Sequence, residues 1–204
     1  MLIIDPYSMG KSNRQLWKDY VEGRSTAGSK TVDSARMALG KFRGIVLGID
    51  PSLRATGLAV VEFRDGGQCV LHHRETIRVH RTLTSTECLA AISDRCEQVA
   101  EQFSIDQVAV EQTIYVQNFR TAMMLGTAKG AALGVLAKKG LPVFEYPPLR
   151  VKQAVVGNGR ASKEQVAHMV SRFLNNAEWG GSDETDAAGV ALCHGFTHRV
   201  IATI

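Results

Sequence analysis

Four acidic side chains stand at places in the sequence where carboxylates could act together. Asp50 and Glu111 each end a short stretch that is typical of a buried β-strand. Asp183 and Asp186 are three residues apart at the start of an expected helix, which places both on one helical face. Carboxylate oxygens are ligands that Mg²⁺ and Mn²⁺ favour, and two such ions can activate water and stabilise a leaving oxygen. The four acids therefore indicate metal-dependent hydrolysis of a phosphodiester.

Each acid also has an ordinary structural interpretation. Asp50 stands before Pro51, and an aspartate in such a turn often accepts hydrogen bonds from backbone N–H groups. Asp183 and Asp186 also suit the first turn of any helix, where the helix dipole favours negative charge. The hairpin alone leaves both a turn cap and a metal ligand open for Asp50. The presence of four carboxylates, rather than one, favours the metal site.

The charges of the chain are distributed unevenly. Residues 44–119 hold six Lys or Arg and ten Asp or Glu, residues 120–172 hold nine and two, and residues 173–204 hold one and four. A basic block between two acidic ones is expected where a polyanion must be brought to a carboxylate cluster. A solvated helix face rich in lysine is the alternative for that block. The distribution favours a nucleic acid as the partner.

Several stretches have the pattern of β-strands. An apolar hairpin at 45–61 leads into a more exposed strand at 69–79, and together they predict a three-stranded antiparallel meander. Two further strands are expected at 105–111 and 140–146, each preceded by a helical pattern. Right-handed crossovers through those helices set the last two strands parallel to the first. The sequence thus predicts an α/β fold with a five-stranded mixed sheet.

The same alternation predicts helices that flank the sheet. Apolar residues recur at helical spacing through 86–103, and residues 120–139 form an expected helix rich in glycine and alanine. A short helix is expected at 151–156, and a longer one follows Ser162, whose Ser-x-x-Gln pattern predicts a capping box. The last helix is expected to begin at Ser182 as its N-cap.

The 204-residue chain divides by composition into an extension and a domain. Residues 1–43 hold eight basic and four acidic residues, and they are expected to be a flexible or tethered extension that adds nonspecific affinity for nucleic acid. Residues 44–204 are expected to form one nuclease domain. No apolar run is long enough to cross a bilayer and no secretory leader is apparent, which favours a cytoplasmic protein with no membrane partner.

Several motifs, in order and at compatible spacing, resemble those of the bacterial RuvC family of Holliday-junction resolvases. They lie at residues 48–57, 110–112, 118, 125–130, 145–148, 151–157, 163–166 and 183–188. The resemblance implies an RNase H-like fold, a homodimer, and paired nicking of four-way junction DNA during recombination and repair. It also implies two Mg²⁺ ions per active site, for which Mn²⁺ can substitute. A branch-migration helicase is the further partner that it implies.

By motif position, the resemblance assigns catalytic, metal-binding roles to the four acids. Asp50 bridges both ions, Glu111 holds one of them, and Asp183 and Asp186 complete the set. Lys163 falls on a family lysine near the scissile phosphate, where it stabilises negative charge and contacts DNA.

The resemblance also assigns residues to DNA binding. Lys152 falls on a second important lysine of the family. The family usually has an aromatic wedge three residues after the strand-end glutamate, a position that is Ile114 here and is followed by Tyr115. Either residue can unstack a base step, so both are candidates for the wedge. Asn118 and Arg120 complete the expected DNA contacts.

Two other functions remain open on the residues alone. Another RNase H-like nuclease, acting on RNA or on other branched DNA, would share the acids. A non-catalytic junction-binding protein would keep the basic block but lose one of the acids, and none is lost here.

Overall fold

The computed structural model describes residues 39–113 and 118–201. Its strands are β1 (Leu39–Lys41), β2 (Gly44–Asp50), β3 (Ala55–Phe63), β4 (Cys69–Arg78), β5 (Gln107–Glu111), β6 (Val143–Tyr146) and β7 (Arg199–Ile201). Its helices are α3 (Ser85–Gln102), α4 (Phe119–Lys138), α5 (Pro148–Val156), α6 (Lys163–Phe173) and α7 (Ser182–Thr197), with a 3₁₀ turn at η1 (Asp65–Gly67). Within these described ranges, every helix is too short or too polar to cross a membrane.

The main sheet has five strands in the order β4-β3-β2-β5-β6. Strands β2, β3 and β4 form an antiparallel meander, because β2 pairs with β3 and β3 with β4. β5 and β6 join on the other side of β2 in parallel. The predicted mixed sheet, a meander plus two parallel strands, is therefore confirmed.

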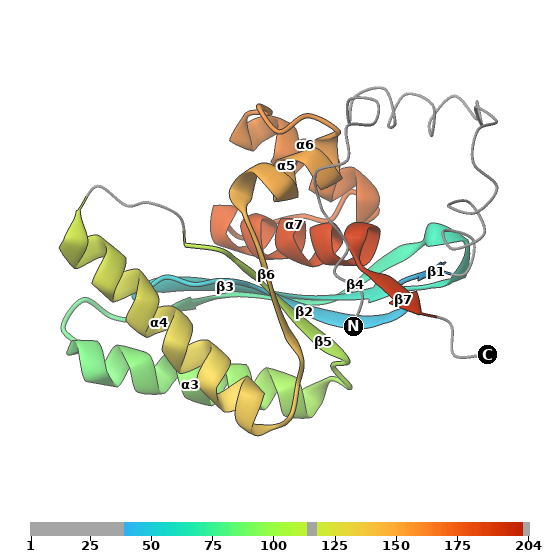
Figure 1. Ribbon diagram of the computed structural model, residues 1–204. Helices are drawn as coiled ribbons and strands as arrows, with labels where there is room; N and C mark the ends of the chain where they lie inside the picture. The colour runs from blue at the N-terminus through green and yellow to red at the C-terminus, as the bar shows by residue number, and fades with distance from the viewer. Residues whose placement is uncertain (1–38, 114–117, 202–204) are drawn as a thin grey trace, which may run out of the picture. The chain divides into compact units, whose positions relative to one another are not determined.

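Helices cover both faces of this sheet, and Figure 1 shows α3 and α4 on one face with α7 on the other. Large aliphatic side chains fill the core between the sheet and the α3–α4 layer. The fully buried examples are Leu47, Ile49, Leu58, Ile92 and Leu136. Burying one such side chain stabilises a fold by about 1.5–3 kcal/mol, so this face contributes much of the hydrophobic stabilisation.

The opposite face carries α7, and glycines let this helix approach the strands closely. A Cβ at Gly48 would overlap the carbonyl oxygen of Ala187. Near the other end of the helix, a Cβ at Gly195 would overlap the ring of Phe63. The distance between α7 and the sheet is thus set by backbone contacts. α5 and α6 pack on α7 from its outer side (Figure 1).

Side chains cap α3 and α6, but not α7. Thr84 caps α3, and Ser162 forms the predicted capping box of α6 with Gln165. The expectation that Ser182 is the N-cap of the last helix is wrong. Ser182 is already helical, and the residue before it is Gly181, which has no side chain to cap the helix. The first turn of α7 is held in another way, which is described with the site below.

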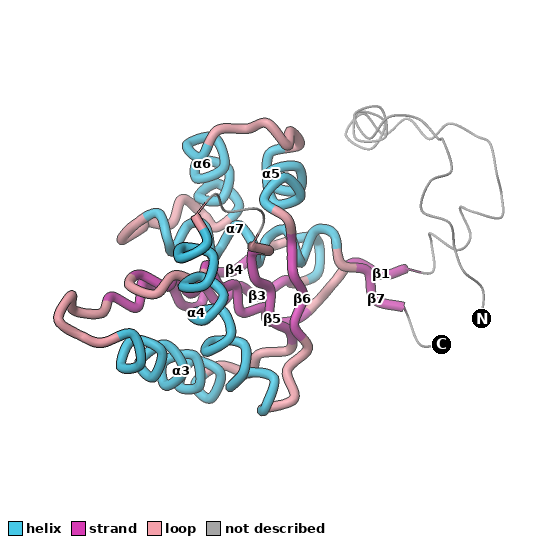
Figure 2. Tube along the Cα trace, turned by 60° about the vertical axis from the view of Figure 1, so that its left-hand side comes forward, coloured by secondary structure: helices cyan, strands magenta, loops and turns pink. Residues whose placement is uncertain are grey.

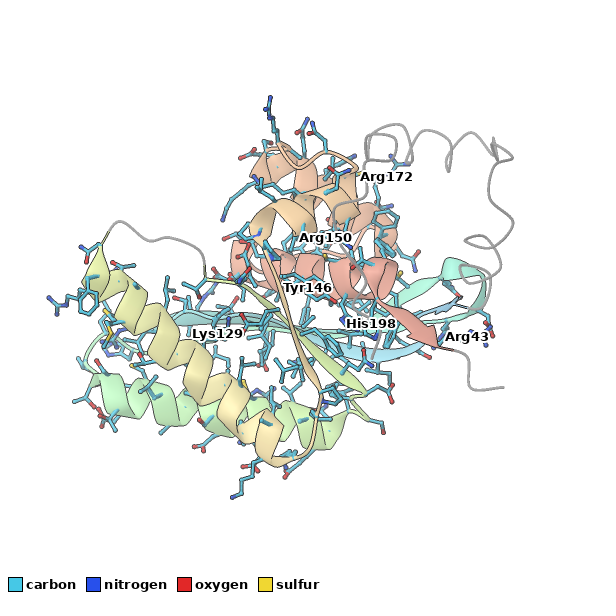
Figure 3. All side chains as sticks on the ribbon, viewed as in Figure 1. Arg43, Lys129, Tyr146, Arg150, Arg172 and His198 are labelled. Carbon is cyan, nitrogen blue, oxygen red and sulfur yellow. The ribbon has the colours of Figure 1, made fainter. Side chains whose placement is uncertain are left out.

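One histidine is buried on the α7 face with both ring nitrogens hydrogen-bonded. His194 Nε2 lies 2.5 Å from Gln107 Oε1, and the Tyr146 hydroxyl oxygen lies 2.8 Å from His194 Nδ1. A neutral imidazole has one donor and one acceptor, so Nε2–H donates to Gln107 and the Tyr146 hydroxyl donates to Nδ1. Figure 3 shows Tyr146 on β6, next to α7. The network joins β5, β6 and the C-terminal half of α7.

A second, two-stranded sheet joins the two ends of the described fold. β1 pairs antiparallel with β7, and Leu39 lies opposite Ile201. Figure 2 shows this pair beside the main sheet rather than within it. β1 precedes residue 44, the expected start of the domain, so residues 39–41 contribute a strand of their own.

Candidate active site

Two carboxylates lie on neighbouring strands of the main sheet, at the edge that is formed by the carboxyl ends of its parallel strands. β2 and β5 run parallel, with Ile49 opposite Val110. Asp50 and Glu111 are the next residues on their strands, so both lie at the carboxyl ends of adjacent strands. Adjacent strands are roughly 4.8 Å apart, which brings the two side chains within reach of a common ligand. This is the arrangement that the sequence predicts for the two strand-end acids.

The N-terminal end of α7 lies against the same edge. Gly57 is the residue opposite Asp50 in the register of β2 and β3. A Cβ at Gly57 would overlap the carbonyl oxygen of Asp183 and would lie 3.1 Å from the Cβ of Asp183. Asp183 therefore sits on the strand beside Asp50, and Asp186 follows on the same side of the helix. The absence of a side chain at Gly57 allows the helix acids to join the strand acids.

The other acids of the cluster are close enough to affect the protonation of the two strand-end carboxylates, Asp50 and Glu111. Burial raises the pKa of Asp50 from 3.8 to about 7, and the charges of the other three acids add to the rise, with Asp186 first among them. Burial also raises the pKa of Glu111, and Asp186 is again the largest charge involved. Carboxylates that repel one another in this way favour the binding of positive charge between them.

Two lysines supply part of that positive charge. Lys163 is the first residue of α6, and its Nζ lies 3.2 Å from Asp186 Oδ2. The Asp186 charge is the main reason that the pKa of Lys163 is raised. The charges of Lys163 and of Lys152, which is on α5, both oppose the rise in the pKa of Glu111 that burial causes. The Lys163 side chain is 76% exposed, so an incoming phosphate can reach it.

The turn after Asp50 is closed by other groups. The Thr56 hydroxyl donates to the carbonyl oxygen of Ser52 at 2.5 Å and accepts from the Ser52 N–H at 3.2 Å. Among the residues that the structure describes, no backbone N–H donates to the Asp50 carboxylate. The turn therefore does not need Asp50 as a cap, which favours the metal-ligand interpretation.

The donors fit a hard divalent cation, although they do not form a closed cage. Across 39–113 and 118–201, no three His, Cys, Asp or Glu side chains already converge as a ligand set for a metal ion. Mg²⁺ seldom needs such a cage, because it usually keeps several waters and binds one or two carboxylates together with substrate phosphates. The charges of Asp186, Glu111 and Asp183 add to the rise in the pKa of Asp50 that burial causes, and oxygen donors are the type that Mg²⁺ and Mn²⁺ prefer.

The other predicted DNA-binding residues lie at or near the start of α4. The side chain of Asn118 caps this helix, because its Oδ1 accepts from the N–H groups of Arg120 and Thr121 at 2.9 and 3.3 Å. Arg120 lies in the first turn and is exposed. Ile114 and Tyr115, the two candidates for the wedge, lie outside the described residues. The role of these four residues toward DNA stays a prediction.

An ion pair that the sequence does not predict holds the start of α7. Glu184 is buried, and its Oε2 accepts from the Gly180 N–H and from Arg74 Nη1, each at 2.9 Å. Arg74 also lies over the ring of Trp179, 5.9 Å from its centroid. This pair fixes the loop before Asp183 in place of an N-cap side chain. Its only sequence signal is a glutamate in the first turn of a helix, which is common in solvent-exposed positions as well.

The comparisons with known proteins agree with one another. A profile of the family described as crossover junction endodeoxyribonuclease RuvC matches residues 46–194. The crossover junction endodeoxyribonuclease RuvC of Cupriavidus metallidurans is 43% identical over 159 residues, which cover 78% of this chain and 87% of that relative. The relative from Pelobacter propionicus is 40% identical over 158 residues, which cover 78% of this chain and 89% of the relative.

Solved structures give the same result. T. thermophilus RuvC in complex with Holliday junction substrate aligns with a TM-score of 0.72 at 35% identity, over 75% of this chain and 93% of that chain. A yeast mitochondrial Holliday junction resolvase aligns with a TM-score of 0.55 at 13% identity, over 74% of this chain and 78% of that chain, and so shares the fold. The predicted RNase H-like fold and the predicted resemblance are both confirmed. The chain belongs to the RuvC family of crossover junction endodeoxyribonucleases.

Proposed function

We propose that this protein is a structure-selective endonuclease that resolves four-way DNA junctions by paired, metal-dependent hydrolysis of phosphodiesters. The observation that carries the proposal is the gathering of four carboxylates and one exposed lysine at a single edge of the sheet. The solved complex of a 35% identical relative with a Holliday junction supports the choice of substrate. We further propose that the protein acts in recombination and repair of DNA, in the cytoplasm.

The four acids would hold two Mg²⁺ ions, or Mn²⁺ in their place. Asp50 lies between Glu111 on the neighbouring strand and Asp183 on the helix, so it would be the carboxylate best placed to help hold both ions. Glu111 is assigned to one ion, and Asp183 and Asp186 complete the set. When bound, the ions supply a more acidic water and stabilise negative charge on the phosphodiester.

The side chains of the protein have their own tasks in the reaction. Lys163 Nζ, held beside Asp186, presents a positive charge where a phosphate would approach the carboxylates, and such a charge stabilises a transition state most strongly where water is excluded. Glu111 is assigned the further task of helping to orient the attacking water. Lys152 on α5 lies on the same side of the site and is assigned to the DNA backbone.

Paired nicking requires two active sites on one junction, so we propose that the protein acts as a homodimer. Ile114 or Tyr115 would serve as the wedge that unstacks a base step at the junction, with Asn118 and Arg120 beside it. Residues 1–43 are proposed to add nonspecific affinity for DNA through their net positive charge. A branch-migration helicase is the proposed protein partner.

The experiment that tests this function is a cleavage panel. The protein is incubated with a synthetic four-way junction, a fork, a duplex and an RNA hairpin, each with and without Mg²⁺. We expect symmetric nicks in two opposite strands of the junction, only when Mg²⁺ is present, and little cleavage of the other substrates. Faster cleavage of RNA or of the fork would assign the site to another type of RNase H-like nuclease. Tight junction binding without cleavage at any metal concentration would indicate a non-catalytic binding protein.

A further inference from the structure

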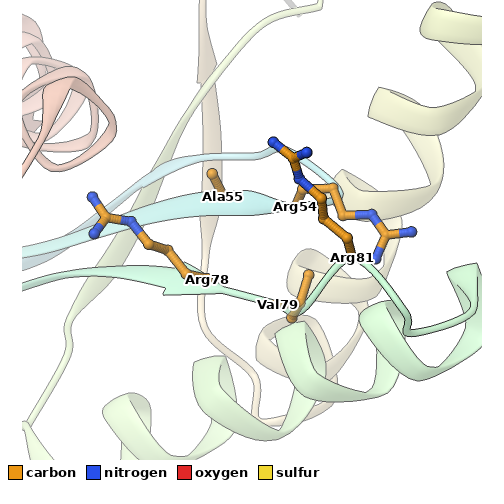
Figure 4. A pocket seen from close by; sticks show the side chains of 5 residues that line it. All are labelled: Arg54, Ala55, Arg78, Val79 and Arg81. Carbon is orange, nitrogen blue, oxygen red and sulfur yellow. The ribbon is translucent and has the colours of Figure 1, made fainter.

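A cleft lined by three arginines lies beside the carboxylate cluster. It has a volume of about 600 Å³, and the arginines that line it are Arg54, Arg78 and Arg81 (Figure 4). The residues expected to contact DNA are Lys152, Lys163 and positions around the start of α4, so these arginines are a separate group. A cleft that has three guanidinium groups and, among the described residues, no acidic lining residue is a suitable place for an anion.

The sheet register places this cleft at the same edge as the carboxylates. Asp50 lies opposite Gly57, and Gly57 lies opposite Thr76 on β4. Arg78 is two residues further along β4, at the end of the strand. Because adjacent strands are about 4.8 Å apart and each residue rises about 3.3 Å along a strand, the end of β4 is roughly 12 Å from the end of β2. The arginines therefore flank Asp50 on the side of β3 and β4. Lys152 on α5 and Lys163 on α6 lie on the other side, near Glu111 and Asp186.

One of the three arginines builds the cleft, and its guanidinium is already occupied. Arg54 donates to the carbonyl oxygens of His80 and Leu83 at 2.9 and 3.0 Å, and to Cys88 Sγ at 3.2 Å. These bonds hold the turn that follows β4. Arg81 lies within this turn, so its backbone is fixed by Arg54.

The other two arginines are available for a ligand. Within the described part of the chain, neither Arg78 nor Arg81 has a carboxylate within 4 Å of its guanidinium group, and both side chains are exposed. Arg78 makes one long hydrogen bond, 3.4 Å from its Nη2 to the carbonyl oxygen of Gly180. A Cβ at Gly181 would lie 3.2 Å from Arg78 Nη2 and 4.0 Å from Asp183 Oδ2. Arg78 therefore reaches the loop that immediately precedes α7, the helix on which Asp183 lies.

We propose that Arg78 and Arg81 bind the phosphodiester backbone of the substrate strand on the flank of the active site opposite to Lys152 and Lys163. Guanidinium groups bind phosphate oxygens through paired N–H donors, and they contact the backbone without reading sequence. The scissile phosphate is then held between two basic flanks and cannot slide along the acidic cluster. This inference rests on the proposed function, because it takes the substrate to be DNA.

The test measures the salt dependence of DNA binding. The full chain binds a labelled four-way junction without divalent metal, and the logarithm of the binding constant is followed against the logarithm of the salt concentration. The binding constant falls as salt rises, and losing one phosphate contact makes this negative slope shallower by about 1. We therefore expect the magnitude of the slope to decrease by about 1 for Arg78→Ala, about 1 for Arg81→Ala and about 2 for the double variant. Arg78→Lys and Arg81→Lys should keep the slope of the wild type, because the charge remains.

Lys138→Ala is the matched control. Lys138 is exposed at the end of α4, which leads to the start of β6 and hence to the opposite edge of the sheet. This variant should keep the wild-type slope. Thermal unfolding checks that each variant is folded, and Arg81→Ala is the safest one because it removes no hydrogen bond within the described residues.

The outcomes separate this inference from the proposed function. An unchanged slope in the folded double variant overturns the inference, and so does an equal decrease in Lys138→Ala. If the wild type cleaves junctions but the arginine variants bind normally, only the inference fails. A different result is that the wild type cleaves no junction, while the double variant has a shallower salt dependence than the wild type in binding a plain duplex. In that case the two arginines do bind phosphates, and only the proposed function fails.

Discussion

The two faces of the sheet are built on different principles. On the α3–α4 face, large aliphatic side chains such as Leu47 and Leu136 fill the space between the layers. On the α7 face, glycines at 48, 57 and 195 let backbone approach backbone or ring directly. A core filled by side chains can adjust to a substitution by changing rotamers, whereas a contact between backbones has little room to move. The first face provides stability, and the second positions the acids.

The largest effect on the positioning of the acids is expected from Gly57→Ala. The new methyl group would overlap the carbonyl oxygen of Asp183, so the start of α7 must move away from Asp50. A displacement of about 1 Å at reacting groups can reduce a rate about 100-fold, and we expect junction cleavage to fall by at least that factor. Gly134→Ala on α4 is the control, because nothing lies within 4 Å of its Cβ. Single-turnover cleavage rates within a factor of two for wild type and Gly57→Ala would contradict the positioning role of the α7 face.

On the other face, Leu136→Ala should lower stability and leave the chemistry intact. Leu136 is fully buried, and truncation of a buried leucine typically lowers the free energy of unfolding by about 2–5 kcal/mol. Urea unfolding measures this loss. The cleavage rate at 20 °C, where the variant is still folded, should stay near that of the wild type. A large loss of rate in the folded variant would mean that both faces position the acids.

The buried histidine makes the stability of the α7 face depend on pH. Burial, with a further contribution from His198, lowers the pKa of His194 from 6.5 to about 4. The unfolded chain takes up the proton below about pH 6.5 and the folded protein only near pH 4, so stability is complete above pH 6.5. It should fall by up to about 3 kcal/mol as the pH drops from 6.5 to 4.

Urea unfolding between pH 7 and pH 4.5, compared between wild type and His194→Gln, isolates this contribution. As the pH falls, the free energy of unfolding should decrease more for the wild type than for His194→Gln. Parallel pH profiles would show that His194 does not titrate in this way.

A smaller effect is expected from the ion pair that holds the start of α7. Glu184→Gln weakens the bond to Arg74, whose side chain is 34% exposed, so we expect a loss of about 1–3 kcal/mol rather than the larger value of a fully buried pair. Because the same bond fixes the loop before Asp183, the maximal cleavage rate should fall while junction affinity is unchanged. Arg74→Lys, which keeps both charges of the pair, should lose less of the rate than Glu184→Gln. A loss of stability with an unchanged rate would limit the pair to a structural role.

The smallest effect concerns Asn118, which caps α4. Asn118→Ala should lower the free energy of unfolding by about 1 kcal/mol, and Asn118→Ser, which can also cap, should not. Junction affinity distinguishes the cap from a DNA contact. If affinity falls in the uncharged Asn118→Ser while stability is unchanged, Asn118 contacts DNA as the resemblance implies.

Much of the fold and of the site follows from the sequence because the relevant signals are local. Apolar alternation identifies the strands, and the rule for right-handed crossovers makes β5 parallel to β2. These two facts are sufficient to bring Asp50 and Glu111 to one edge. The close approach of α7 was not predicted, because Gly57 reveals its role only once its partner in the register is known.

Other features could not be predicted, either because charge was counted over a whole segment or because one residue type suits two different roles. Residues 44–119 have more acidic than basic residues, yet three of the six arginines in this segment meet at one cleft. Counting charge along the sequence cannot detect them, because the turn after β4 brings them together in space. Asn118 suits both a helix cap and a DNA contact, and the identity of the residue does not separate the two roles. Ser182 has the side chain of a good N-cap, but the Glu184–Arg74 pair fixes the start of the helix one residue earlier.

The central claim is that Asp50, Glu111, Asp183 and Asp186 form one metal-dependent nuclease centre, and Asp50→Asn tests it most directly. The measurement is cleavage of a synthetic four-way junction in Mg²⁺, with junction binding followed in parallel. Asparagine keeps the shape of the side chain but removes the charge that would be shared by the ions. The variant should bind the junction with nearly wild-type affinity and produce no nicks. Cleavage by Asp50→Asn at the wild-type rate would contradict the assignment of the site.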